Sequence, residues 1–212
     1  MSQTIHSTWH GAGLALRSVH VPELLATRPN IAWLEVLADN YLYGDCRAAI
    51  AVLRQLRERY PVALHSVGLD VGSQAPLDPG MLRGLAELAN QLDPELISTH
   101  LCWLQSDQIA HHDLLPLPFT EEAVAHCAER IARMQDALGE RIAIENVSTY
   151  LRWSDAACGP QMTEAQFLAA VALAADCYLL LDINNIYVNY RNHCASPAGR
   201  IRLYHLAGFA DR

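Results

Sequence analysis

Short runs of apolar residues recur along the 212-residue chain, and a longer stretch with helical periodicity follows most of them. The runs are continuous rather than alternating, which is typical of strands that are buried on both faces of a parallel sheet. A strand that alternates repeatedly with a helix indicates a parallel α/β fold. We predict strands at residues 13–16, 32–36, 62–66, 96–100, 142–146, 178–182 and 201–206.

The segments between these runs carry recognisable helix starts. Asp78 stands before Pro79, which is the pattern of an N-cap followed by proline in the first helical position. Thr163 with Gln166 three residues later forms a capping box, and a further helix is predicted over residues 123–138. Because no low-complexity linker interrupts the alternation, we expect one domain over residues 1–212.

The choice between an open sheet and a closed barrel depends on motifs and on strand count. No G-x-G-x-x-G or G-x-x-x-x-G-K-[ST] motif follows any strand, so the nucleotide-binding open sheets lose their usual support. A complete barrel has eight strands in about 250 residues. We therefore expect a TIM-like (β/α) barrel with about seven of its eight strands, the last strand and helix lying beyond residue 212.

Composition narrows the function classes. A net charge of -8 and a pI near 5.6 disfavour binding to nucleic acid. Six cysteines without a C-x-x-C pair indicate neither a disulfide scaffold nor a zinc ribbon. The N-terminus does not resemble a signal peptide, and no apolar stretch approaches the length of a membrane span. We expect a cytoplasmic protein that does not bind membranes.

Potential metal ligands mark the ends of the predicted strands. His65, His100, Glu145 and Asp182 each end one strand, and His205 lies within the last. In a parallel barrel these ends converge on one face, where active sites lie. Imidazole and carboxylate donors without thiolate favour iron, manganese or zinc, and this set exceeds what one tetrahedral zinc ion needs. The structural alternative is a hydrogen-bonded network, in which Asp182 would cap a following helix.

Other residues rank lower as candidates. Glu35, near the end of the second strand, would join the same face. Cys102 is as readily a core thiol as a group that approaches the cavity. His126 falls on a helix, at the surface or between helices. His111 and its neighbour His112 are expected in a solvated polar loop.

Five segments resemble one known family in their order along the chain. They are His65-Ser-Val-Gly-Leu-Asp-Val-Gly-Ser73, Ser98-Thr-His-Leu-Cys-Trp103, Glu145-Asn-Val-Ser148, Leu181-Asp-Ile-Asn-Asn-Ile-Tyr-Val-Asn189 and His205-Leu-Ala-Gly208. The sequence is similar to the multinuclear non-haem iron-dependent oxidative enzymes, the family that includes the methanobactin-biosynthesis oxidase. Relative to that family the chain looks truncated at its C-terminus, since a later Asp-Thr-His motif and an eighth strand are absent.

The resemblance implies a TIM-like barrel with two or three non-haem irons, which uses dioxygen to oxidise cysteine in a ribosomally made precursor peptide. It also implies a small partner protein that delivers the peptide. The ligands it implies are His65, His100, Glu145, Asp182, Asn185 and His205. Asn185 stands where some members have histidine. If the chain is truncated, we expect weaker iron binding and an inactive protein.

Two other readings remain open from the residues themselves. The first is a divalent-metal-dependent isomerase or hydrolase on the same kind of barrel, in which the ions polarise a sugar or a phosphoester. The second is an inactive fragment that serves as a binding module for a peptide or a partner. Zinc or manganese without dioxygen uptake would favour the first, and a stable protein with no metal would favour the second.

Overall fold

The computed structural model describes residues 10–106, 109–151, 153 and 162–193. The chain divides into two compact units. The first contains residues 1–69, 77–99 and 133–143, and the second contains residues 70–76, 100–132 and 144–212. The predicted strand at 201–206, with His205, lies outside the described residues.

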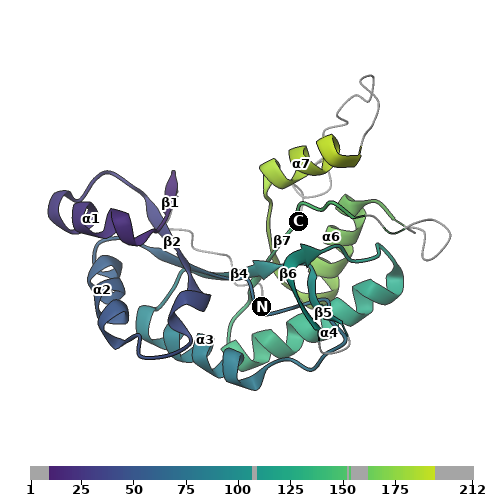
Figure 1. Cartoon of the computed structure of the whole chain (residues 1–212), viewed down its shortest axis with the longest axis horizontal. Helices are drawn as coiled ribbons and strands as arrows, with labels where there is room; N and C mark the ends of the chain where they lie inside the picture. The colour runs from purple at the N-terminus through teal and green to yellow at the C-terminus, as the bar shows by residue number, and fades with distance from the viewer. Residues whose placement is uncertain (1–9, 107–108, 152, 154–161, 194–212) are drawn as a thin grey trace. The chain divides into compact units, whose positions relative to one another are not determined.

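Six strands form one sheet, in which their order follows their order in the sequence. Figure 1 labels several of them. The first four strands pair in parallel. This order is the one that a (β/α) repeat produces when each strand is added beside the last. The strands are β1 (Gly13–Ala15), β2 (Trp33–Leu37), β3 (Val62–Ser66), β4 (Leu96–His100), β7 (Ala143–Glu145) and β8 (Tyr178–Leu180).

The first unit packs short helices against the start of the sheet. It contains α1 (Val21–Thr27), α2 (Arg47–Arg57), α3 (Pro79–Leu92) and 3₁₀ helices at Ser18–His20 and Ala38–Tyr41. Helix α3 begins as the sequence predicts, because the Asp78 carboxylate accepts the N–H of Gly80 at 2.7 Å. Every residue of β3 is buried, which explains the apolar run Val-Ala-Leu that precedes His65.

The second unit contains α6 (Glu164–Ala175) and α7 (Ile183–His193), and α4 (Glu121–Leu138) begins in it. The predicted capping box at the start of α6 is present, with the Thr163 N–H donating to Gln166 Oε1 at 2.8 Å. Cys127, Ile131 and Phe167 are buried in its core. Within the described residues, no helix is both long enough and apolar enough to cross a membrane.

The polar segment before residue 116 corrects one prediction. Strands β5 (Trp103–Ser106) and β6 (Ile109–Leu115) form an antiparallel pair here, so both His111 and His112 lie in a strand and not in a loop. The His111 and Trp103 rings are nearly perpendicular, at an interplanar angle of 84°, with 5.5 Å between centroids. Cross-strand contacts of this kind stabilise the hairpin. Its polar composition resembles that of a loop, which is why the sequence did not predict these strands.

Candidate metal centre

His65 is held in β3 by a partner on the neighbouring strand. The strand register places it opposite Ser98, and its Nδ1 lies 2.9 Å from the Ser98 hydroxyl oxygen. When that hydroxyl donates to the carbonyl oxygen of Leu64, at 3.4 Å, Nδ1–H is the donor toward Ser98. In this tautomer the lone pair is on Nε2, which is the atom that would bind a metal.

The electrostatic surroundings keep this imidazole in the ligand form. Burial lowers the pKa of His65, and the carboxylates of Glu35 and Asp39 oppose that shift without reversing it. The ring is therefore neutral near pH 7, as metal binding requires. Asp39 also fixes the chain after β3, because its two carboxylate oxygens accept the N–H groups of Val67 and Gly68, each at 2.9 Å.

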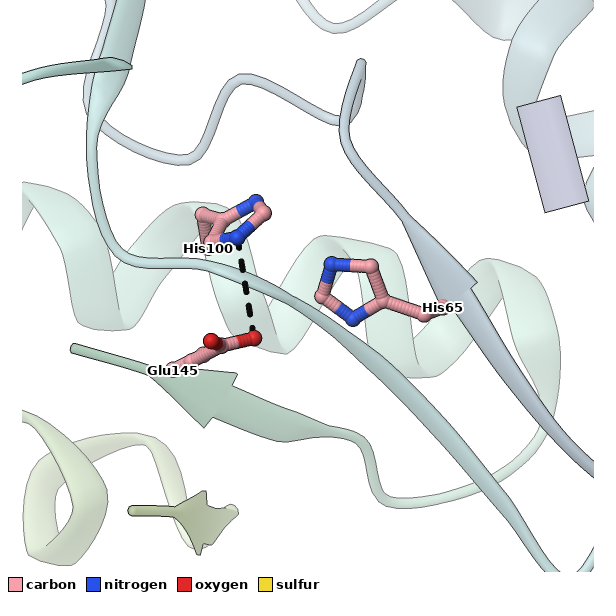
Figure 2. A group of neighbouring side chains, drawn as sticks. All are labelled: His65, His100 and Glu145. Atoms are coloured by element: carbon pink, nitrogen blue, oxygen red, sulfur yellow. Dashed lines mark ion pairs between the residues drawn. The ribbon is translucent and has the colours of Figure 1, made fainter. Parts of the chain in front are cut away.

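His100 and Glu145 form an ion pair, which is the second part of the site. His100 ends β4 and Glu145 ends β7, and His100 Nε2 lies 3.6 Å from Glu145 Oε2 (Figure 2). Their side chains are 13% and 10% exposed. The N–H of Leu101 donates to the Glu145 carbonyl oxygen at 2.9 Å, which ties the two strand ends together. A carboxylate this buried is costly unless cations or donors compensate its charge.

Together, His65, His100 and Glu145 offer a set of donors that fits a metal ion. Each contributes one ligand atom, and these atoms all lie within 4.8 Å of one another (Figure 2). Two imidazole nitrogens and a carboxylate oxygen, with no thiolate, suit iron, manganese or zinc. Half of the six residues predicted as ligands are thus brought together. The sixth, His205, lies outside the described residues.

Asp182 and Asn185 are found in a hydrogen-bond network at the start of α7. Strand β8 ends at Leu180, so Asp182 stands just before the helix and accepts the N–H of Asn185 at 2.9 Å. Asn146 bonds to the main chain of Asp182 in both directions, at 2.8 and 3.0 Å. The capping alternative for Asp182 is therefore correct, and the role of both residues as ligands stays a prediction.

Cys102 is a core thiol. It is 1% exposed, and burial raises the pKa of its thiol far above the ordinary value, with the charge of Asp70 adding to the effect. A thiolate, the form that binds metals, is therefore strongly disfavoured at this position.

The second unit contains a cleft of about 660 Å³. Leu101 and Asn146, which follow His100 and Glu145 in the chain, form part of its lining. One wall is aromatic, with the rings of Phe119 and Phe167 5.1 Å apart. The other lining residues are Pro116, Leu117, Val147, Thr149, Leu151, Trp153, Met162, Thr163, Glu164, Gln166, Leu168, Asn189 and His193. Sequence reasoning missed this cleft, because its walls come from segments far apart in the chain.

Comparison with known proteins identifies the family. The model of the RiPP precursor modification enzymes MbnB/TglH/ChrH matches residues 11–212. The chain belongs to this family. The MbnB/TglH/ChrH match extends over both units, and it indicates that the chain is an enzyme.

Relatives at the sequence level are UPF0276 proteins. That of Acaryochloris marina is 44% identical over 210 residues, covering 95% of this chain and 74% of the relative. That of Anaeromyxobacter sp. is 42% identical, covering 95% of this chain and 72% of the relative. The identities are high enough for a shared fold throughout the aligned region.

Among solved structures, sugar epimerases share the fold of this MbnB/TglH/ChrH member. D-psicose 3-epimerase with D-fructose aligns at a TM-score of 0.53 and 12% identity, covering 85% of this chain and 63% of the epimerase. The enzyme of Clostridium cellulolyticum H10 with D-tagatose aligns at 0.54 and 12%, covering 84% and 65%. The chain thus spans slightly less than two thirds of these structures. Since the neighbours are TIM barrels, the predicted TIM-like (β/α) class is confirmed.

Proposed function

We propose that this MbnB/TglH/ChrH member is an iron-dependent oxidase that holds two or three non-haem ions and oxidises cysteine residues of a ribosomally made precursor peptide with dioxygen. The observation that carries the proposal is the buried group of His65, His100 and Glu145, which supplies nitrogen and oxygen donors without thiolate. Iron, when bound, supplies a redox couple and exchangeable coordination positions. The cysteine electrons pass to dioxygen, which is the oxidant.

The residues of the chain supply position and environment. His65 and His100 would hold iron through neutral imidazoles, and Glu145 would hold it through a carboxylate that also offsets the charge of the ion. We propose that the peptide lies in the cleft, with apolar side chains against Phe119 and Phe167. An apolar wall of this kind excludes water from the reacting thiol. A small partner protein would deliver the peptide.

Metal analysis and dioxygen uptake test the proposal together. We expect the protein purified without oxygen to contain iron in excess of zinc and manganese. We also expect dioxygen uptake only when a cysteine-containing precursor peptide is added. A serine-for-cysteine version of the same peptide is the matched control. Zinc or manganese as the native metal, with no dioxygen uptake in either case, would contradict the oxidase and favour an isomerase or hydrolase.

A further inference from the structure

Three asparagines on one face of α7 bind the main chain that follows the metal ligand Glu145. They are spaced by four and three residues, so their side chains project from the same side of the helix. Each donates its amide N–H to a different carbonyl oxygen. The pairs are Asn185 with Asn146 at 2.9 Å, Asn189 with Val147 at 2.8 Å and Asn192 with Thr149 at 2.9 Å. We call Asn185, Asn189 and Asn192 the asparagine ladder.

Asn189 is the central member and uses both ends of its amide. Its Oδ1 accepts the N–H of Thr149 at 2.7 Å, while its Nδ2 donates to the Val147 carbonyl oxygen. The Thr149 hydroxyl is also 3.0 Å from Nε2 of His193, one turn further along α7. Both main-chain bonds require a side chain of this length that carries a donor and an acceptor on the same terminal group. The asparagine amide meets this requirement.

The segment that receives these bonds is buried, so its main-chain N–H and carbonyl groups require hydrogen-bond partners. Residues 146–149 lie outside any helix or strand, yet Asn146, Val147 and Thr149 are 2%, 7% and 8% exposed. Buried carbonyl and N–H groups without partners cost about 1–3 kcal/mol each. The ladder therefore replaces the hydrogen bonds that a neighbouring strand would supply.

We propose that the asparagine ladder is a positioning device, which fixes the segment after β7 and thereby the direction in which the Glu145 carboxylate enters the metal centre. This inference rests on the metal-binding part of the proposed function. Asn146 directly follows Glu145, so a shift of the segment moves the carboxylate relative to His100. Residues that orient metal ligands in this way typically contribute a factor of about 10–100 to metal affinity.

Cobalt(II) titration of the otherwise metal-free protein tests the ladder with the metal alone as probe. Asn189→Leu keeps a similar volume and removes both bonds, and we expect it to weaken Co²⁺ binding by at least about tenfold and to shift the visible absorption bands. Asn189→Asp keeps the acceptor but sets a charged oxygen against the Val147 carbonyl oxygen and the Glu164 carboxylate, so it should also weaken Co²⁺ binding. Asn184→Leu is the matched control, because Asn184 lies on the same helix with an exposed side chain, and we expect an unchanged titration.

A double-mutant cycle separates positioning from general stability. If the ladder acts through the carboxylate, Asn189→Leu will weaken Co²⁺ binding much less when Glu145→Gln is already present. Equal effects in both backgrounds would overturn the proposal, as would a folded Asn189→Leu protein with wild-type affinity and spectrum. Asn192→Ala removes one bond only, and if Asn189→Leu does not fold it carries the same test, with a smaller shift in the same direction.

The outcomes distinguish the ladder from the oxidase. A wild-type protein that binds no Co²⁺ would overturn the metal centre and the ladder together. A protein that binds Co²⁺ with ladder dependence but takes up no dioxygen with the peptide would leave the ladder established and contradict only the oxidase.

Discussion

Replacing His100 with alanine is expected to remove metal binding and turnover while the protein remains folded. His100 Nε2 lies 3.6 Å from Glu145 Oε2, and both side chains are nearly buried. Without the imidazole, the metal loses a nitrogen donor and the carboxylate loses its neighbour. Loss of a residue that merely orients a ligand already costs about 10–100-fold in affinity, so loss of the ligand itself should exceed that range.

The effect on stability should be much smaller than the effect on the metal. The substitution leaves a small cavity and one hydrogen-bonding group fewer beside Glu145, which costs about 1–3 kcal/mol. A domain with 5–15 kcal/mol of stability tolerates such a loss. Circular dichroism and thermal unfolding of the metal-free protein would measure it.

The measurement is iron content after anaerobic reconstitution, together with dioxygen uptake in the presence of the peptide. His20→Ala is the control, because His20 lies in the first 3₁₀ turn, where its Nδ1 accepts the N–H of Arg17. We expect the control to keep wild-type iron. A His100→Ala protein with undiminished iron and turnover would remove this residue from the site.

The strands that carry the centre were predictable because they are buried on both faces. The predicted ranges 62–66 and 96–100 agree with β3 and β4 residue for residue. The prediction for 178–182 runs two residues beyond β8, which ends at Leu180. An aspartate after an apolar run marks either a strand end or a helix N-cap, and only the structure shows that Asp182 caps α7.

The supporting contacts of the site were not predictable from the same patterns. Ser98 lies 33 residues from its partner His65, and the ladder asparagines bind carbonyl groups 39 to 43 residues earlier in the chain. The spacing of the asparagines is visible in the sequence, but nothing local shows which main-chain groups lack partners. Such pairing is a property of the tertiary structure, whereas strand-end ligands follow from periodicity alone.

Replacing Asp70 with alanine is expected to destabilise the second unit by about 3 kcal/mol, since hydrogen bonds to a buried charged acceptor contribute about 1.5–3 kcal/mol each. Asp70 is 6% exposed, and its Oδ1 accepts the N–H of Leu104 at 2.7 Å and the Ser73 hydroxyl at 2.5 Å. Alanine also tolerates the left-handed backbone at this position poorly, where φ is 53°.

Asp70→Asn is the variant that isolates the contribution of the charge. Asparagine keeps an acceptor for Leu104 and Ser73 and adopts positive φ more readily than alanine. Arg130 donates to the Asp70 carbonyl oxygen at 2.8 Å, and this main-chain bond survives in both variants. Urea unfolding of the metal-free proteins should therefore show a clearly smaller loss for asparagine than for alanine. Equal losses would mean that the Asp70 charge stabilises this loop, and not its bonds to β5 and Ser73 or its backbone preference.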